Sequence, residues 1–437
     1  MEYEDFVKKK RRAEVATGHN PGPLNEHLFD FQHAIVSWAV RRGRAAIFAD
    51  TGLGKTLMQL SWADEVASHT GGMVLVLAPL AVSEQTIEQG QNFGIEVRRV
   101  PAGGTPDAPG VWITNYERMD AIDFESLHGL VLDESSILKA HDGKTRQAII
   151  DAAQGIPYRL SCTATPSPND FEELGNQCEF LGVMTRTEML ATYFVNDTGD
   201  TGTWRLKGWG ASKFWEWMGT WAVVLRNPSD LGFDGLRYEL PALKYFEHVV
   251  QTDPLEGDLF SRPAMGLAER RKAQRDSIEA RCNELAKVVN ADQSEPWLIW
   301  CHLNDEAELL QSLIPGSINV QGSDSAESKA KNLIGFAHGD FRVLISKPKI
   351  AGFGMNWQHC ARMAFVGLDD SFEKFYQAVR RCYRFGQKRE VNVHLFTAEN
   401  EGQILENLRR KESQHHEMSA NMIEHMRDIM NTELTGQ

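Results

Sequence analysis

The sequence has 437 residues, which at roughly 100–200 residues per domain predicts two or three domains. Hydrophobic residues make up 42% and charged residues 24%, a globular composition, and no apolar run approaches the ~18 residues of a membrane span. The formal net charge of −14 excludes a chain that is basic throughout, the usual mark of bulk nucleic-acid affinity.

A local basic groove is compatible with that charge. Three basic clusters are candidates for it, and each is equally well explained as a solvated helix face: Arg41–Arg44, Arg270–Lys272 and Arg380–Arg389. The charged stretch Lys8–Arg12 is followed by no apolar segment, so we expect no secretory signal. The six cysteines are scattered, without a Cys-x-x-Cys pair, which favours reduced thiols over a zinc site or a disulfide framework. We therefore expect a cytoplasmic protein that contacts no membrane.

Residues 1–23 are expected to form a lead-in, because they end in Gly18–Pro23, a turn-rich stretch that cannot continue a helix. A helical pattern follows and includes Gln32. An amide carries donors and an acceptor side by side, so Gln32 can read an adenine edge, although a glutamine at this place is weak evidence by itself.

A glycine-bearing turn over Ala49–Thr56 organises the first half of the chain. The apolar run Ala45–Phe48 predicts a strand before it, and a helical pattern begins at Lys55. Glycines let backbone N–H groups face an anion, and the helix N-terminus adds the positive end of its dipole. Lys55 can reach the β- and γ-phosphates of a nucleotide, and Thr56 can ligate Mg²⁺. The predicted nucleotide-binding residues are Gln32, Thr51, Gly52, Leu53, Gly54, Lys55 and Thr56.

Strands and helices then alternate, as in an α/β protein with a parallel sheet. Continuous apolar runs, typical of strands that are covered on both faces, occur at 73–78, 111–116, 130–134 and 159–166. In open sheets of this kind, ligands bind at the carboxyl ends of the strands. Lys55, Asp133 and the stretch Thr163–Thr165 all follow such ends.

Asp133 and Glu134 form an acidic pair at the end of one of these strands. Two adjacent acids are costly there unless they serve a cation or a reaction. We expect Asp133 to hold Mg²⁺ through water, and Glu134 to orient and deprotonate the water that attacks the γ-phosphate. An acidic loop or helix cap is the less favoured alternative, because a phosphate loop lies upstream.

Residues 183–245 interrupt the alternation and are predicted to form a helical connecting segment rich in tryptophan. Tryptophans beside basic residues can stack on nucleic-acid bases, but tryptophan is more often buried, so we favour a small core that joins two larger units. The tryptophans are Trp204, Trp209, Trp215, Trp217 and Trp221.

The second half repeats the alternation over residues 246–437. Its apolar runs lie at 296–301, 317–320, 341–346, 363–366 and 391–396. No second Gly-Lys-Thr occurs, so this part binds no triphosphate in that way. The tail beyond Ala398 is expected to pack on this second domain as an amphipathic helix.

Gln377, Arg381 and Arg384 would share one face of a helix, because they are spaced i, i+4 and i+7. The two arginines are then placed to act as arginine fingers on a nucleotide bound elsewhere. A helix face that forms salt bridges is the alternative.

The order of these features resembles helicase superfamily 2, and within it the Swi/Snf-like DNA translocases, over about residues 28–408. Gln32 looks like the adenine-reading glutamine of that family, and Arg384–Gln387 points to the Swi/Snf-like branch. Ser135 and Ser136 stand where the family usually has Ala-His, and that histidine commonly links motif II to motif III. The stretches that resemble motifs I, Ia, Ib, II, III, V and VI are, in that order, Ala49–Thr56, Ala78–Leu80, Ile113–Glu117, Asp133–Glu134, Thr163–Pro166, Ala351–Asn356 and Gln377–Gln387.

The resemblance implies two RecA-like parallel-sheet lobes of the P-loop NTPase class, one over 24–182 and one over 246–437, with ATP and Mg²⁺ in the cleft between them. It implies a DNA-stimulated ATP hydrolase that translocates on duplex or forked DNA. Its implied catalytic residues are Glu134, Gln377, Arg381 and Arg384, and its implied metal residues are Thr56 and Asp133. A compact motor without chromatin-reader domains is expected to be a bacterial or phage protein and a monomer, with replication or recombination proteins as candidate partners.

Two other functions stay open. A strand-separating helicase on DNA or RNA uses the same ATPase core, although Arg384–Gln387 and the lack of a wedge insertion weigh against it. A nucleotide-gated DNA-binding scaffold with little hydrolysis is suggested by Ser135, Ser136 and the acidic net charge.

Overall fold

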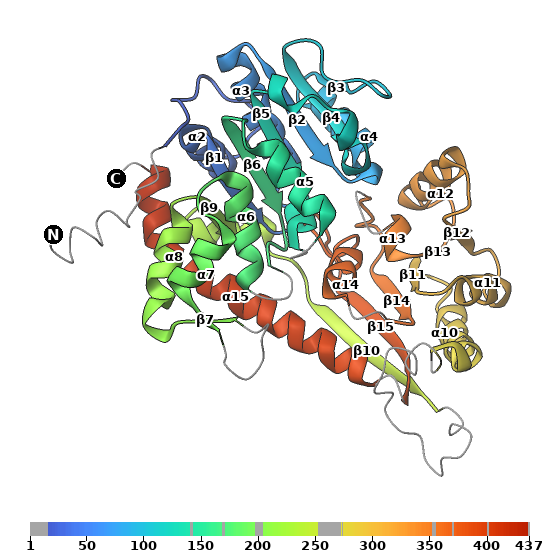
Figure 1. The fold of residues 1–437 in the computed structure, drawn as a ribbon. Coiled ribbons are helices and arrows are strands. Elements are labelled where there is room, and N and C mark those ends of the chain that lie inside the picture. Colours follow the sequence, from blue (N-terminus) through green and yellow to red (C-terminus); the bar gives the residue numbers. More distant parts are fainter. Residues whose placement is uncertain are drawn as a thin grey trace. The chain divides into compact units, whose positions relative to one another are not determined.

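The computed structural model describes residues 16–139, 143–167, 171–196, 204–251, 272, 274–351, 355–368, 371–399 and 402–435. These residues form two compact units (Figure 1). The first runs to Arg237 and also includes the residues from His415 onward, and the second runs from Tyr238 to Gln414. Most of the expected lead-in, residues 270–271 of one basic cluster and residues 352–354 of the predicted motif V lie outside the described residues.

A seven-stranded sheet forms the centre of the first unit, and its described strand pairs are all parallel. The strand order is β3-β4-β2-β5-β6-β1-β9. The strands are β1 (Arg44–Ala49), β2 (Met73–Ala78), β3 (Val97–Arg99), β4 (Gly110–Asn115), β5 (Gly129–Asp133), β6 (Tyr158–Thr163) and β9 (Ala222–Leu225). The α/β fold with a parallel sheet that the apolar runs predict is confirmed.

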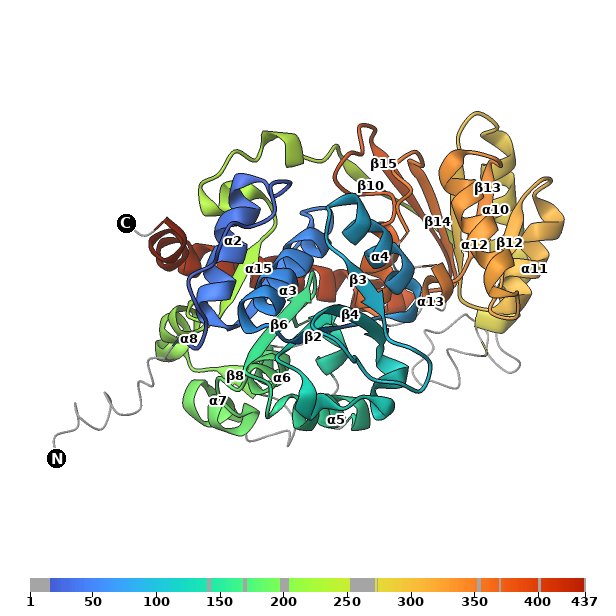
Figure 2. The same ribbon diagram turned by 90° about the horizontal axis from the view of Figure 1, so that it is seen from above.

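Helices cover both faces of this sheet, which explains why its strands are apolar throughout. In Figure 2, α2, α3 and α4 lie on one side and α5, α6 and α7 on the other. The helices are α2 (Asp30–Arg42), α3 (Lys55–Thr70), α4 (Ser83–Asn92), α5 (Lys144–Ala153), α6 (Leu174–Leu181), α7 (Arg186–Tyr193) and α8 (Ala211–Gly219). A short antiparallel pair, β7 (Phe194–Asn196) and β8 (Trp204–Leu206), follows α7.

The tryptophan-rich segment contributes to the first unit as far as Arg237. Its strand β9 pairs with β1, and Trp221, just before β9, is fully buried. Trp215 of α8 is buried as well, and the rings of Tyr193 and Trp217 stack with centroids 5.2 Å apart. Burial in a core, the favoured interpretation, therefore describes Trp215 and Trp221, and the segment extends the first sheet.

The second unit is built on a six-stranded parallel sheet of order β10-β15-β14-β11-β13-β12. Its strands are β10 (Leu243–Val250), β11 (Trp297–Cys301), β12 (Ile318–Val320), β13 (Val343–Ser346), β14 (Arg362–Val366) and β15 (Val391–Ala398). Its helices are α10 (Ile278–Ala291), α11 (Asn304–Leu313), α12 (Ala326–His338), α13 (Pro348–Ala351) and α14 (Phe372–Val379). Apolar side chains of α10 and α11 pack on β11, β13 and β14 in one buried cluster. The sheet begins at Leu243, three residues upstream of the expected boundary at 246.

Helix α15 (Gly402–Thr435) begins in the second unit and ends in the first. Four buried methionines recur every four residues along it and so line one face: Met418, Met422, Met426 and Met430. Arg427 Nη2 donates to the carbonyl of Ser229 at 3.3 Å. The tail expected on the second domain thus contributes its residues from His415 onward to the first unit, where Arg427 contacts Ser229.

Two expectations from composition concern the whole chain. None of the helices that the structure describes is long and apolar enough to cross a membrane. All six cysteines are buried and none forms a disulfide. Burial raises the pKa of the Cys162 thiol well above its usual value, so this side chain stays protonated.

Candidate active site

The loop between β1 and α3 has the backbone shape of a phosphate-binding turn. Gly52 and Gly54 adopt φ angles of 88° and 77°, left-handed values that any side chain disfavours. Helix α3 begins at Lys55, and no side chain of the described residues caps its N-terminus. Its first N–H groups therefore keep their capacity to bind an anion.

Lys55 lies folded over this loop, at the carboxyl end of β1. Its Nζ donates to the carbonyls of Ala49, at 2.7 Å, and Asp50, at 3.2 Å. Burial lowers the pKa of the Lys55 ammonium. Three nearby carboxylates oppose that shift, those of Glu134, Asp50 and Asp133. Strands β1 and β5 thus bring the predicted phosphate-binding lysine and the predicted acidic pair to one place.

Gln32 braces the phosphate loop from α2. Its Nε2 donates to the carbonyl of Leu53 at 2.9 Å, and its Oε1 accepts from the N–H of Phe29 at 2.9 Å. A Cβ at position 54 would lie 2.2 Å from Gln32 Nε2, so Gly54 is what lets the amide reach the loop. One amide hydrogen and one lone pair remain, and recognition of adenine by Gln32 stays a prediction.

The surroundings of Asp133 fit a hydrated Mg²⁺. Asp133 ends β5 and is 6% exposed, and burial raises the pKa of its carboxyl while Lys55 opposes the shift. Gln59 of α3 lies beside this carboxylate, where a side-chain hydrogen bond from its amide opposes the rise of the Asp133 pKa, and the amide oxygen has no hydrogen-bond partner among the described residues. A carboxylate, an unpaired amide oxygen and the Thr56 hydroxyl in the first turn of α3 are the oxygen groups that Mg²⁺ and its waters prefer.

Sequence reasoning missed Gln59. The available signal was a polar side chain four residues after Lys55, on the helical face that Lys55 begins. A glutamine in a helix that also carries Ser61, Asp64 and Glu65 is too common to be singled out without the fold.

Glu134 is held in an unusual backbone conformation. Its φ is 55°, the sole positive value among the non-glycine residues that the structure describes. Such a conformation costs of order 1–3 kcal/mol and persists where the surroundings fix it. Thr163 Oγ1 donates to Glu134 Oε2 at 3.3 Å, and the Tyr116 hydroxyl donates to the carbonyl of Asp133 at 2.7 Å. An oriented carboxylate is what a general base requires, so this geometry suits the role predicted for Glu134.

Gln377, Arg381 and Arg384 lie together in the second unit. Arg381 Nη2 donates to Gln377 Oε1 at 2.9 Å. Arg381 Nη1 and Arg384 Nη1 both donate to the carbonyl of Met355, at 3.2 and 3.4 Å. Burial lowers the pKa of Arg384. The three residues therefore gather at one end of the predicted motif V, and their action on a nucleotide stays a prediction.

The prediction that one helix carries Gln377, Arg381 and Arg384 is wrong. Helix α14 ends at Val379, and the carbonyl of Arg381 accepts a hydrogen bond from the N–H of Trp357 at 2.9 Å. Backbone bonds of the shorter i→i−3 type follow the helix, as in turns. A tertiary bond to a distant segment thus ends the helix, and periodicity does not reveal such a bond.

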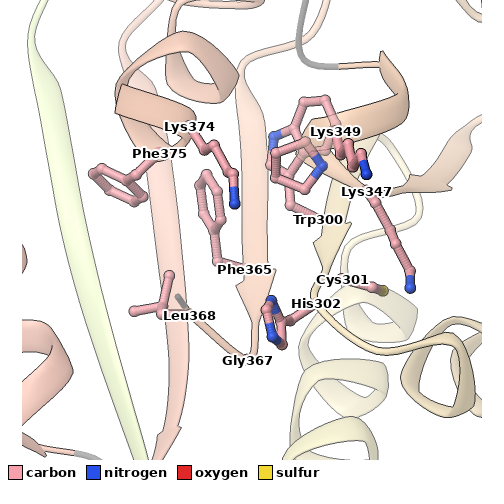
Figure 3. A pocket seen from close by; sticks show the side chains of 11 residues that line it. Trp300, Cys301, His302, Lys347, Lys349, Phe365, Gly367, Leu368, Lys374 and Phe375 are labelled. Carbon is pink, nitrogen blue, oxygen red and sulfur yellow. The ribbon is translucent and has the colours of Figure 1, made fainter. Parts of the chain in front are cut away.

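A cavity of about 200 Å³ lies at the carboxyl ends of β11, β13 and β14 (Figure 3). We call this cavity the lysine pocket. Its lining combines aromatic and basic side chains, those of Trp300, Phe365, Phe375, His302, Lys347, Lys349 and Lys374. Trp300 Nε1 is buried and has no partner among the described residues. These groups fit an anionic ligand. Sequence reasoning missed Lys347 and Lys349, although two lysines directly after a predicted strand were a usable signal.

Comparison with known proteins places these features in context. No family model matches the chain. The chain is 23% identical over 423 residues to the DNA annealing helicase and endonuclease ZRANB3 of Bos taurus. It is 27% identical over 207 residues to a probable chromatin-remodeling complex ATPase chain of Oryza sativa subsp. japonica. These matches take in 86% and 40% of the chain, which spans 39% and 18% of the length of the two relatives.

Among solved structures, a variant of S. cerevisiae Dbp5 bound to RNA and ADP BeF3 superposes with a TM-score of 0.54 at 13% identity. The match covers 90% of this chain and 93% of that chain, and it shows the fold: two RecA-like lobes. The resemblance that the motifs predict is confirmed: in sequence the chain is similar to Swi/Snf-like ATPases of helicase superfamily 2, and its fold agrees with that resemblance.

Proposed function

We propose that the protein is a DNA-stimulated ATP hydrolase that couples turnover to movement along duplex or forked DNA. The observation that carries the proposal is the meeting of Lys55, Asp133 and Glu134 at the carboxyl edge of the first sheet. A lysine and two carboxylates beside an uncapped helix N-terminus are the groups that phosphoryl transfer requires. A site that only binds nucleotide has no need of an oriented second carboxylate.

Binding of ATP would place its β- and γ-phosphates against the first N–H groups of α3. Lys55 Nζ would exchange the carbonyl of Ala49 for phosphate oxygens, which are stronger acceptors for an ammonium. Thr56 and Asp133 are the residues that would hold Mg²⁺, which when bound neutralises charge on the phosphate oxygens.

The chemical step is assigned to Glu134. Its carboxylate accepts a proton from the attacking water, and the Thr163 hydroxyl holds the carboxylate in orientation. Gln377, Arg381 and Arg384 are proposed to stabilise the negative charge of the γ-phosphoryl group in the transition state.

Contact with DNA is proposed at the lysine pocket. The net charge of −14 means that attraction to phosphate must be local, and Lys347, Lys349 and Lys374 concentrate three positive charges at one edge of the second sheet. We further propose that the protein acts as a monomer in a bacterial or phage-infected cytoplasm, where replication or recombination proteins are candidate partners.

The test is the ATPase rate with no nucleic acid and with single-stranded, duplex and forked DNA and with RNA, each over a range of salt. Stimulation by duplex or forked DNA that weakens with salt supports the proposal. A rate that no nucleic acid changes would favour a nucleotide-gated scaffold. Displacement of a triplex strand without unwinding of a fork would mark a translocase, whereas fork unwinding would mark a strand-separating helicase.

A further inference from the structure

Gln177 of α6 bridges the turn after Asp133 to strand β6. Its Nε2 donates to the carbonyl of Ser135 at 3.0 Å, and its Oε1 accepts from Ser161 Oγ at 2.5 Å. Gln177 is 1% exposed, and both serines are fully buried. A buried amide is costly unless both of its ends are paired, and here each end is paired with a different segment.

This bridge closes a ring around the carboxylate of Glu134. Ser135 follows Glu134 directly in the chain. Ser161 precedes Thr163 by two residues, so the two side chains lie on the same face of β6. Thr163 Oγ1 in turn donates to Glu134 Oε2 at 3.3 Å. The ring therefore returns to its starting point through Gln177 and β6.

The ring explains how the strained backbone of Glu134 is maintained. Tyr116 fixes the carbonyl on the near side, that of Asp133, and Gln177 fixes the carbonyl on the far side, that of Ser135. The hydroxyl of Ser135 is buried without a partner among the described residues, so the side chain of Ser135 does not make this link. The hydrogen bond that fixes the Ser135 backbone comes instead from Gln177 of α6.

We infer that Gln177 is a positioning residue that holds Glu134 in its catalytic conformation. This inference rests on the proposed ATPase function and adds to it a residue outside all the motifs named above. Removing the amide would leave one buried carbonyl and one buried hydroxyl without partners and would open the ring. Among the residues that the structure describes, no hydrogen bond joins Gln177 to Lys55 or the phosphate loop, so the effect is expected on turnover and not on ATP affinity.

The experiment compares Gln177→Met with Asn176→Leu in the full-length protein. Asn176 is the matched control, because it is the adjacent residue of α6, is also 1% exposed and also makes two side-chain hydrogen bonds. Those bonds join Arg146 and the carbonyl of Leu138, outside the ring. Measured quantities are kcat and KM for ATP, binding of a fluorescent ATP analogue, and the thermal unfolding midpoint.

We expect Gln177→Met to lower kcat by roughly tenfold or more, the effect of one to two hydrogen bonds, with ATP binding within about twofold of wild type. Asn176→Leu is expected to keep kcat near wild type even if its unfolding midpoint falls as far as that of Gln177→Met. Because Ser161→Ala opens the same ring, the double variant Gln177→Met/Ser161→Ala should be no slower than Gln177→Met.

Two results overturn the inference. If the wild type turns over ATP and the two α6 variants lose kcat equally, Gln177 has only a structural role. If Gln177→Met weakens ATP binding and leaves kcat unchanged, it does not act through Glu134. A wild-type protein without ATPase activity would instead refute the proposed function, and the inference with it.

Discussion

The guanidinium of Arg281 and the carboxylate of Glu306 form a fully buried ion pair in the second unit, with Nη1 and Oε1 2.8 Å apart. The other carboxylate oxygen of Glu306 accepts from the N–H groups of His302 and Leu303, each at 2.9 Å. Because His302 lines the lysine pocket, this ion pair fixes the turn that forms one wall of the pocket. A Cβ at Gly367, another lining residue, would lie 2.5 Å from Glu306 Oε1.

Substitution of Arg281 by methionine would leave the Glu306 charge buried without its partner. We expect a loss of about 3–5 kcal/mol in the free energy of unfolding, measured by chemical denaturation. The control is Lys287→Met, which removes an exposed ion pair with Glu284 on the same helix and is expected to leave stability near wild type. Similar losses of unfolding free energy in both variants would mean that burial does not increase the contribution of the ion pair to stability.

Glu134→Gln tests the assignment of the general base. Glutamine keeps the size of the side chain and can still accept from Thr163, but it cannot take a proton from water. We expect ATP turnover to be abolished and binding of a fluorescent ATP analogue to be retained. Glu125→Gln, an exposed acid in the same unit and outside the named motifs, serves as the control. Full turnover in Glu134→Gln would refute the role.

Asp133→Asn is expected to stabilise the ligand-free protein and to remove a carboxylate predicted to hold Mg²⁺. Burial raises the folded-state pKa of Asp133 above its ordinary value of 3.8. The folded protein therefore binds this proton more tightly than the unfolded chain, so its contribution to stability is present below the ordinary Asp pKa and is lost as the pH rises through the folded-state pKa. The charged carboxylate thus destabilises the ligand-free protein at neutral pH, and asparagine relieves that cost.

The expected result is a higher thermal unfolding midpoint for Asp133→Asn than for wild type at about pH 7, with a difference that shrinks toward about pH 4. With ATP and Mg²⁺ present, the wild type should gain more than the variant, because it alone keeps the carboxylate for the metal. A variant less stable than wild type at neutral pH without ligand would contradict the argument.

How far the sequence could predict the site depended on the separation of the partners along the chain. Lys55, Thr56 and the acidic pair follow apolar strands directly, so local pattern and the rule on carboxyl ends of strands were enough to place them. Gln59 and Gln177 acquire their meaning from segments that only the fold brings to them. Gln59 had only its spacing from Lys55 as a signal and Gln177 had none, since glutamine is common on helices of every kind.

The same reason explains the differences in the fold. The central strands of both sheets follow from the apolar runs, because strands covered on two faces leave a clear pattern, whereas β3, β9 and β10 lie outside the predicted runs. Strand β9 pairs with β1, although most of the first unit's sequence separates them. Helix α14 ends near the point where the N–H of Trp357 donates to the carbonyl of Arg381. Neither long-range contact has a local signature. The methionine face of α15 was visible as an apolar stripe, but a stripe does not say which surface covers it.

Arg381→Ala tests the proposed arginine finger. Loss of an arginine finger lowers kcat by roughly 10³-fold in other phosphoryl-transfer enzymes, and we expect a fall of that order with ATP affinity little changed. Arg381 also bonds Gln377 and the carbonyl of Met355, so the unfolding midpoint must be measured alongside. Arg389→Ala, which removes a half-exposed pair with Glu295 in the same unit, is the control. Weaker ATP binding with unchanged turnover would argue for a binding role.

Lys347→Ala/Lys349→Ala tests the lysine pocket as a DNA contact. If each lysine neutralises one phosphate, the slope of log affinity against log salt should fall by about 0.9 per lysine on duplex DNA. Fluorescence anisotropy with labelled duplexes at several salt concentrations measures this slope. Lys329→Ala removes a lysine from α12 that does not line the pocket, so its slope should match wild type. The double variant should keep the ATPase rate measured without DNA, because none of the residues assigned to the nucleotide lines the pocket. It should need more DNA for half-maximal stimulation. An unchanged salt slope would exclude these lysines from the DNA interface and leave the aromatic pocket to a different anion.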